Sequence, residues 1–362
     1  MKILYDNQIF IAQKFGGISR YFFELINKRN NLYDYEIPLI YTDNEYSKIL
    51  GINKEFPIKF SFKGKYKITN FLNKYNNKKI INIKNYDIFH PTYYNTIYLN
   101  YIKDIPFVID VHDMIYEIFP EYNDSKIINS KKEYFLKANR IISNSNKTKE
   151  DLMHFIPELN PNKIIVIYRG EVFKNIKYIS NSEKQKYILF TGQRSGYKNF
   201  INFIKAVSEI LIQFDLKLIC TGSKFSNSEL KLLNEHNILD RVNSLFLSEN
   251  ELQNIYANAL LFVFPSLYEG FGFPILEAFS SGCPALLSNE SCFPEIAGDA
   301  AVYFNPYSVE DMKEKIEDVI TNNYLQKSLI EKGFERLKFY SWENTIKQTY
   351  QLYSDVLSNV QY

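Results

Sequence analysis

Short apolar runs that end at a glycine or a polar residue, each followed by a segment of helical spacing, recur along this chain. KILYD at residues 2–6 precedes a segment in which Ile18, Tyr21, Phe22 and Leu25 fall at helical spacing. Later runs of the same kind are DIFHPT, PFVIDVHD, YILFTG, LKLICTG and LLFVFPS. Buried parallel strands alternating with helices produce this pattern. The sequence therefore predicts an α/β fold.

The length of 362 residues exceeds what one small hydrophobic core accommodates, so we expect two domains. Residues 172–186 are polar and without a clear period, and they predict a linker. The predicted domains are thus residues 1–172 and residues 186–344. Ligands bind beyond the carboxyl ends of the strands in open parallel sheets, so we expect the site in a cleft between the two halves.

The composition is that of an ordinary globular protein, with 46% apolar and 23% charged residues, which argues against disorder. No apolar run approaches about 18 residues, so no membrane span is expected. The N-terminus lacks the cationic lead and long apolar core of a secretion signal. Cys220, Cys283 and Cys292 form no C-x-x-C pair, which is typical of a reducing compartment. A cytoplasmic location is expected.

Charge is distributed unevenly along the chain. Residues 1–175 contain 26 Lys and Arg against 19 Asp and Glu, while the remainder contains 17 against 22. The segment from Lys54 to Lys84 carries nine lysines and one acidic residue, Glu55, with Phe, Tyr and Ile interleaved. Two interpretations stay open: a solvated surface, or peripheral docking on anionic lipid headgroups at the inner face of the cytoplasmic membrane. No nucleic-acid partner is expected.

Two glutamates, Glu269 and Glu277, flank a Gly-Phe-Gly turn in LYEGFGFPILEAF. Gly270 and Gly272 permit backbone geometry that other residues avoid, and Pro274 suits the first turn of a helix. We expect Glu277 within that first turn and Glu269 in the loop before it, so the carboxylates do not share a helical face. The amides of the turn and the helix dipole predict an anion site. A plain helix cap with a dipole-favoured glutamate is the alternative.

A second cluster lies in TGQRSGYKNF, where a strand ends at Gly192 and is followed by Arg194 and Lys198. Two cations beside a glycine-rich loop suit a diphosphate, since Arg engages two oxygens at once. The spacing is not that of a P-loop. Solvated loop charges are the alternative.

Two weaker signals lie in the first half. QKFGGISRY places Gly16 and Gly17 directly before a helix, where the backbone can approach a phosphate or simply turn; it lacks the G-x-G-x-x-G fingerprint. His112 and Asp113 follow a predicted strand, but neighbouring strand residues point to opposite faces. The four histidines form no H-x-x-x-H and no G-x-S-x-G occurs, so neither a metal site nor a serine-hydrolase nucleophile is expected.

The segment FPSLYEGFGFPILEAFSSGCPALLSN resembles the signature of retaining glycosyltransferases of family 4, with its E-x7-E element. Other segments match that family in its order along the chain: GGISRY, VHDMIYE, TGQRSGYKN, LFLSENELQNIYANA, PEIAGDAAVYFNP and YSWENT. The resemblance covers nearly the whole chain and is nearest to bacterial O-antigen and capsule mannosyltransferases. It implies the GT-B architecture: two Rossmann-like domains facing across a cleft, with a last helix, about residues 345–362, crossing back to the first domain.

The resemblance also implies roles for residues of the second half. Glu277 binds the donor's ribose hydroxyls, and Glu269 holds the transferred sugar. Backbone amides of Phe271, Gly272 and Phe273 assist Glu269. Gly192 and Gly270 belong to the loops that receive the donor.

For the diphosphate leaving group, the resemblance implies neutralisation by Arg194 and Lys198, which stand four apart here and five apart in many relatives. In the first half, Gly16 and Gly17 allow close approach of a loop, and His112 contacts the sugar near the reacting centre.

The implied function is a retaining transfer, without metal or other cofactor, from a nucleotide-diphosphate sugar to a lipid-linked glycan. A GDP-sugar, with mannose or a related hexose, is the first expectation and a UDP-sugar the second. Two alternatives stay open: a non-catalytic nucleotide-sugar-binding protein, and a glycoside hydrolase using Glu269 and Glu277, whose carboxylates must then lie roughly 5–9 Å apart.

Overall fold

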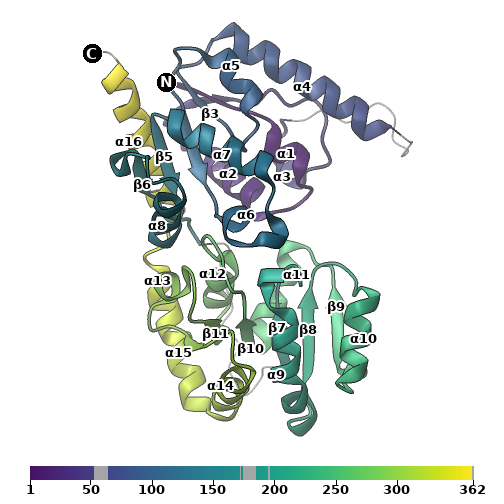
Figure 1. Ribbon diagram of the computed structural model, residues 1–362. Coiled ribbons are helices and arrows are strands. Elements are labelled where there is room, and N and C mark those ends of the chain that lie inside the picture. Colours follow the sequence, from purple (N-terminus) through teal and green to yellow (C-terminus); the bar gives the residue numbers. More distant parts are fainter. Residues whose placement is uncertain (53–63, 172, 174–184, 195, 361–362) are drawn as a thin grey trace. The chain divides into compact units, whose positions relative to one another are not determined.

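The computed structural model describes residues 1–52, 64–171, 173, 185–194 and 196–360. It divides into two compact units. Unit 1 comprises Met1–Gly170 and Trp342–Tyr362, and unit 2 comprises Glu171–Ser341 (Figure 1). Most of the predicted linker and the beginning of the lysine-rich segment lie outside the described residues.

Unit 1 is built on two short parallel sheets. The first has the order β2-β1-β3 and the second the order β4-β5-β6, and a bridge between Phe89 and Phe107 joins them. The strands are β1 (Lys2–Tyr5), β2 (Asp34–Glu36), β3 (Ile88–His90), β4 (Val108–Val111), β5 (Arg140–Ser143) and β6 (Ile164–Val166). Their side chains are largely buried, as parallel strands covered on both faces require.

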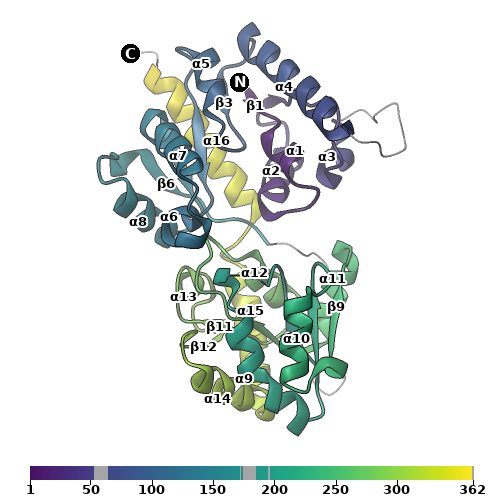
Figure 2. The same cartoon turned by 45° about the vertical axis from the view of Figure 1, so that its right-hand side comes forward.

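Helices connect and cover these strands. They are α1 (Gln8–Ala12), α2 (Gly17–Asn27), α3 (Glu45–Ile49), α4 (Lys65–Ile83), α5 (Leu99–Ile102), α6 (Ile115–Ile118), α7 (Ser125–Lys137) and α8 (Asn146–Phe155). The last helix, α16 (Trp342–Val360), also belongs to unit 1 and packs against α2 (Figures 1 and 2). Ser145 caps α8 by accepting a hydrogen bond from the Thr148 amide, and serine is among the residues preferred at this position.

Unit 2 contains a parallel sheet with the order β12-β11-β10-β7-β8-β9 in its described residues. The strands are β7 (Gln185–Phe190), β8 (Lys217–Thr221), β9 (Val242–Leu245), β10 (Ala259–Phe264), β11 (Ala285–Ser288) and β12 (Val302–Phe304). This is the strand order of a doubly wound dinucleotide-binding fold. The predicted α/β class is confirmed.

The helices of unit 2 lie on both sides of that sheet (Figure 1). They are α9 (Phe200–Gln213), α10 (Asn227–Glu235), α11 (Glu249–Asn258), α12 (Phe273–Ser280), α13 (Phe293–Ala297), α14 (Val309–Thr321) and α15 (Asn323–Leu337). A core of fully buried side chains, including Phe203, Leu218 and Ile316, joins α9 and α14 to the strands. This core fixes where the strands end, and so where the loops begin.

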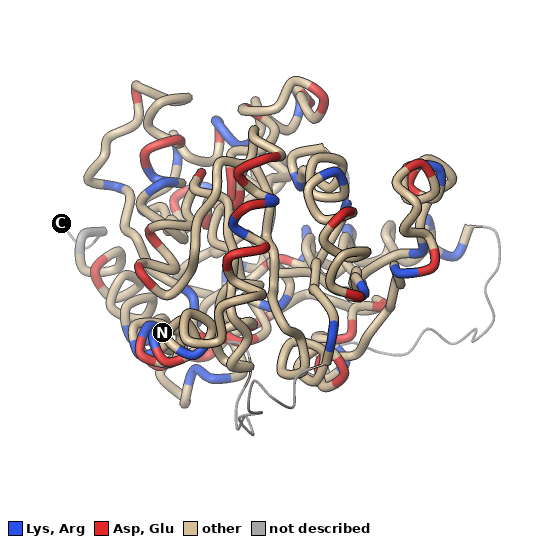
Figure 3. The backbone as a smooth tube through the Cα atoms, turned by 90° about the horizontal axis from the view of Figure 1, so that it is seen from below, with Lys and Arg blue, Asp and Glu red and all other residues tan. Residues whose placement is uncertain are grey.

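Lys and Arg residues alternate with Asp and Glu residues along much of the described chain (Figure 3). No helix of the described residues is both long enough and apolar enough to cross a membrane.

Candidate functional site

The strand order of unit 2 reverses between β7 and β10. From β7 the sheet continues to β8 and β9, and from β10 it continues to β11 and β12. Open α/β sheets bind ligands beyond the carboxyl ends of the strands at such a switch point. The loop after β7 carries Gly192, Arg194 and Lys198, and the loop after β10 carries Glu269. Both predicted clusters therefore lie at the switch point of one sheet.

Lys198 and Glu269 are brought together here as an ion pair between Nζ and Oε1. The Leu267 amide donates to the Tyr197 carbonyl at 2.7 Å and ties the two loops. On the other side, Ser291 Oγ donates to the Glu269 carbonyl at 2.7 Å and accepts from its amide at 3.1 Å. The side chains of Lys198 and Glu269 keep 14% and 15% of their surface exposed. The pair is held firmly, yet solvent reaches both charges.

The Gly-Phe-Gly turn owes its shape to Gly272, which adopts φ +85° immediately before α12. This left-handed conformation favours glycine, and a Cβ there would lie 3.0 Å from Ile275 Cδ1. The Phe271 ring is buried, with its centroid 5.9 Å from that of Tyr340. Phe271 can therefore face a ligand only through its backbone.

The structure corrects the predicted place of Glu277. Because α12 begins at Phe273, Glu277 is its fifth residue and lies just beyond the first turn, with Pro274 inside that turn as predicted. The carboxylate is buried, and Tyr256 Oη donates to its Oε2 at 3.0 Å. Thr191 Oγ1, at the end of β7, lies 3.1 Å from Tyr256 Oη.

Tyr256 could not be singled out from the sequence, because an aromatic residue inside an amphipathic helix indicates only packing. Burial and the neighbouring Glu277 charge raise its pKa well above the usual range. Tyr256 is thus a neutral hydrogen-bond donor at neutral pH, and it orients the Glu277 carboxylate.

Arg194 has a different setting from Lys198. Its Nε donates to Glu229 Oε1 at 2.7 Å, and its Nη2 donates to the Ser223 carbonyl at 2.6 Å. The guanidinium lies 4.7 Å from the Phe225 ring centroid, and the side chain is almost completely buried. These contacts fasten the loop after β7 to the loop between β8 and α10, so this structure presents Arg194 as a cross-link between loops.

A cavity of about 1030 Å³ opens on this side of unit 2, lined by Arg194, Lys224 and Glu229 together with residues of α9 and α10. Neither Lys198 nor Glu269 lines it. We therefore place the candidate site at the Lys198–Glu269 pair. This pair lies at the switch point of the sheet and brings together side chains from the loops after β7 and β10.

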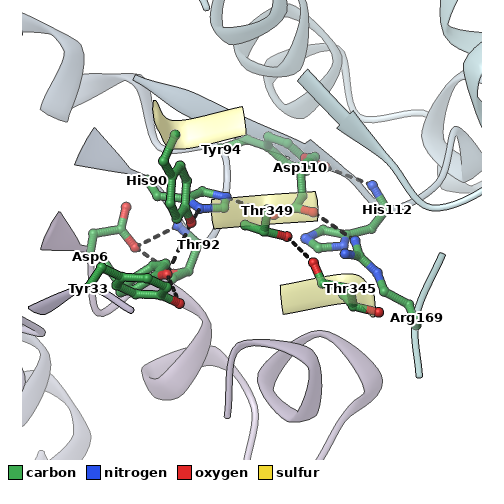
Figure 4. A network of polar contacts seen from close by, with 12 residues as sticks. Asp6, Tyr33, His90, Thr92, Tyr94, Asp110, His112, Arg169, Thr345 and Thr349 are labelled. Atoms are coloured by element: carbon green, nitrogen blue, oxygen red, sulfur yellow. Dashed lines mark hydrogen bonds and ion pairs between the residues drawn. The ribbon is translucent and has the colours of Figure 1, made fainter. Parts of the chain in front are cut away.

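His112 lies in unit 1, directly after β4, and its ring centroid is 6.1 Å from that of Tyr21 on α2 (Figure 4). Burial lowers its pKa to about 4, although the Asp110 charge opposes this. The imidazole is therefore neutral at neutral pH. Asp113 Oδ1 accepts from the Ile115 amide at 3.1 Å, at the start of α6, so this carboxylate oxygen bonds to the backbone rather than to His112.

His112 lies beside a buried polar network (Figure 4). Arg169 Nη2 lies 2.7 Å from Asp110 Oδ1, and His90 Nε2 lies 2.8 Å from Asp110 Oδ2. His90 Nδ1 in turn lies 2.6 Å from Tyr353 Oη on α16. Burial raises the pKa of Asp110, but the Arg169 charge and His90 outweigh it and hold that pKa well below the usual range. This network attaches α16 to β3 and β4, and His112 directly follows β4.

The start of α2 at Gly16 is shaped by Gln13, a residue that the sequence did not single out. A Cβ on Gly16 would lie 2.3 Å from Gln13 Oε1, and the same oxygen accepts from the Ser19 amide at 3.2 Å. Gly17 is the first residue of α2. Gly16 thus admits the Gln13 side chain, which covers the start of the helix.

Among the residues that the structure describes, no group of three or more His, Cys, Asp or Glu side chains is arranged to hold a metal ion.

Comparisons with known proteins agree with this geometry. Residues 15–170 match the family model described as Glycosyltransferase Family 4, and residues 171–336 match the model described as Glycosyl transferases group 1. Together the two matches cover most of the chain, and the second includes Lys198 and Glu269. The protein is a glycosyltransferase by class. It belongs to glycosyltransferase family 4.

One similar curated protein is the O-antigen chain mannosyltransferase B of Escherichia coli. It is 37% identical over 108 residues, which are 30% of this chain and 28% of that protein. The chain thus spans under a third of this relative's length.

Two solved structures are similar over almost their whole length. Sucrose-phosphate synthase from Thermosynechococcus elongatus has a TM-score of 0.75 at 16% identity and covers 99% of this chain and 100% of its own. HepE from Anabaena, solved with UDP and glucose, has a TM-score of 0.74 at 16% identity, covering 98% and 99%. These similarities confirm the GT-B fold.

Proposed function

We propose that this protein transfers a sugar from a nucleotide-diphosphate sugar to a glycan acceptor in the synthesis of a surface polysaccharide. The observation that carries the proposal is the Lys198–Glu269 pair at the switch point of the unit 2 sheet. Family membership supports the reaction class, and the similarity to an O-antigen mannosyltransferase supports a polysaccharide product.

The two charges of the pair suit opposite ends of the bond that breaks. Lys198 neutralises the diphosphate as it leaves, and Glu269 accepts hydrogen bonds from hydroxyls of the transferred sugar. Amides of residues 271–273 add donors at the same turn. Groups already oriented toward developing charge contribute most to such a rate enhancement.

Glu277 takes the ribose hydroxyls, with Tyr256 holding one carboxylate oxygen. Arg194 serves the diphosphate site indirectly, by fixing the loop that also carries Lys198.

The reaction proceeds with retention of configuration. The bond between the anomeric carbon and the diphosphate oxygen breaks, and the acceptor oxygen bonds to that carbon on the same face. The acceptor hydroxyl's proton passes to the leaving phosphate, so no protein base is required. We propose no metal in this step. Nuclear magnetic resonance of the product anomer tests retention, and an unchanged rate in EDTA tests independence from metal.

For the donor we propose a GDP-sugar of mannose or a related hexose, with a UDP-sugar as the second choice. The named mannosyltransferase supports the first, and the UDP in the HepE structure supports the second. For the acceptor we propose a lipid-linked glycan at the inner face of the cytoplasmic membrane, with peripheral membrane contact through the segment from Lys54 to Lys84.

Lys198→Ala tests the leaving-group role. We expect kcat to fall about 10²- to 10³-fold, the range for removing one donor of developing charge, with the fold retained. Lys205→Ala, on the exposed side of α9, is the matched control and should keep normal turnover. Near-normal turnover in Lys198→Ala would remove the role assigned to Lys198. Nucleoside diphosphate release by the wild-type chain separates an enzyme from a protein that only binds nucleotide sugars.

A further inference from the structure

The loop after β11 carries a residue in a rare backbone conformation. Ser291 has φ +60°, in the left-handed region that glycine adopts readily and serine rarely does. A side chain there lowers the stability of the fold. Such strain persists only where the surrounding structure imposes it, and it is concentrated at functional sites. Ser291 must therefore be held in this conformation by its neighbours.

The chain on both sides of Ser291 is anchored within unit 2. Phe293, two positions later, is completely buried, and its ring centroid lies 5.0 Å from that of Phe264, the last residue of β10. On the other side, the Glu290 amide donates to Ser288 Oγ at 3.2 Å, at the end of β11. These contacts fix the path of the loop, and they impose the left-handed conformation on the residue between them.

In this conformation the Ser291 hydroxyl bonds to both backbone groups of Glu269. Ser291 Oγ accepts from the Glu269 amide at 3.1 Å and donates to the Glu269 carbonyl at 2.7 Å. The paired residues of β10 and β11 end at Phe264 and Leu287, before either of these two residues. One side chain thus satisfies an amide and a carbonyl beyond the strand ends, as a neighbouring strand does within the sheet. Glu269 cannot turn without breaking both bonds.

We propose that Ser291 is a positioning residue for Glu269: its hydroxyl holds the Glu269 backbone so that the carboxylate meets Lys198. This inference rests on the proposed function, in which Glu269 holds the transferred sugar. A misplacement of about 1 Å can cost about 10²-fold in rate, so a fixed backbone at this point affects turnover. Packing alone gives no reason for the hydroxyl, because glycine would adopt the same φ without strain.

Two substitutions separate the hydroxyl from the backbone strain. Ser291→Ala removes the hydroxyl and keeps a Cβ in the left-handed conformation, whereas Ser291→Gly removes both. The melting temperature of the Gly variant should therefore lie about 2–4 °C above that of the Ala variant. Both variants should lose kcat about 10- to 100-fold, because both lack the hydroxyl. A role in loop stability alone would leave kcat per folded chain near the wild-type value in both.

A double-mutant cycle tests whether Ser291 acts through Glu269, since residues that act through one another give non-additive effects. In Glu269→Gln the carboxylate that the hydroxyl positions is already absent. Adding Ser291→Ala to that variant should therefore lower kcat by less than about twofold, the spread seen for independent sites. The full chain and the same donor and acceptor are used for all four proteins of the cycle.

The affinity for GDP or UDP gives a second measurement that needs no sugar transfer. A Glu269 carboxylate that is held less firmly competes less well for Lys198. Ser291→Ala should therefore bind the nucleoside diphosphate about two- to fivefold more tightly than the wild type, less than the gain from removing the charge itself. In the Glu269→Gln background the same addition should leave the dissociation constant unchanged. Isothermal titration measures all four values.

The matched control is Asn237, which has φ +56° and is exposed between α10 and β9. Asn237→Ala and Asn237→Gly should show the same order of melting temperatures with normal kcat. The proposal is overturned if Ser291→Ala keeps the wild-type kcat, or loses the same factor in the Glu269→Gln background. It is also overturned if Glu269→Gln tightens nucleoside diphosphate binding and Ser291→Ala does not. If Glu269→Gln itself changes neither kcat nor affinity, the role proposed for Glu269 fails, and the inference fails with it.

Discussion

Glu269→Gln should strengthen the binding of a nucleoside diphosphate while it slows sugar transfer. Without a donor, the Lys198 ammonium is paired with the Glu269 carboxylate. A diphosphate that reaches Lys198 competes with that carboxylate for the same cation. Removing the carboxylate charge removes the competitor, and it also removes the group that we assign to the transferred sugar.

The magnitude follows from the setting of the pair. Two unit charges 4 Å apart attract by about 4 kcal/mol at an effective dielectric constant of 20, but desolvation offsets much of this. The net contribution of a hydrogen bond to a charged group is roughly 1.5–3 kcal/mol. Glutamine keeps a neutral acceptor for Lys198, so we expect about 1–2 kcal/mol to be released. The dissociation constant for the nucleoside diphosphate should therefore fall about 5- to 30-fold.

Isothermal titration with GDP and with UDP measures the affinity, and initial rates with the matching donor measure kcat. Glu209→Gln makes the same change of net charge in an exposed ion pair with Lys313 and should leave both quantities unchanged. If Glu269→Gln binds the nucleoside diphosphate equally or more weakly, the carboxylate does not compete for Lys198 and the argument fails.

Three further predictions concern residues around the site. Tyr256→Phe removes the hydroxyl that orients Glu277 and should raise the donor KM about 5- to 30-fold with little change in kcat. Tyr187 is another buried tyrosine whose hydroxyl has a backbone partner, and Tyr187→Phe should leave the donor KM unchanged. Arg194→Ala breaks a largely buried ion pair. Because 19% of the Glu229 side chain is exposed, we expect the free energy of unfolding to fall by roughly 2–3 kcal/mol, which is below the range for fully buried pairs. Denaturant titration measures this loss, and an unchanged midpoint would contradict the cross-link. For His112, the folded pKa of about 4 lies below the unfolded value of about 6.5. The unfolded state therefore binds the proton first, and the stability of the protein falls as the pH drops from 6.5 toward 4. Melting temperatures across this range should fall less in His112→Gln than in the wild type.

Much of the fold was predictable because parallel strands leave a local signal. Each buried strand is an apolar run ended by a polar residue or glycine, and β1, β4, β7 and β10 all lie within runs of this kind. A helix cap such as Ser145 also depends on its immediate neighbours, because it acts on amides two or three residues away.

The side-chain directions at the site were not predictable in this way. Arg194 and Lys198 share one loop, yet one is buried against Glu229 and the other meets Glu269. The direction of each side chain depends on its neighbours, and the order of the strands in the sheet determines which residues those are. That order cannot be read from the local spacing of residues. Glu277 was expected within the first turn of α12 but lies just beyond it, because the helix begins at Phe273, directly after the left-handed Gly272.

The most direct test of the central claim is to incubate the chain with a panel of GDP- and UDP-sugars and a glycan acceptor, and to quantify released nucleoside diphosphate and elongated glycan. Thermal shift with each donor runs in parallel, since a donor at about 100 times its dissociation constant stabilises the fold by roughly 2.7 kcal/mol. The account predicts that at least one donor both stabilises the chain and yields equal amounts of nucleoside diphosphate and elongated glycan, and that Lys198→Ala loses the turnover. A donor that stabilises the chain without any release, or release that Lys198→Ala retains, would contradict it.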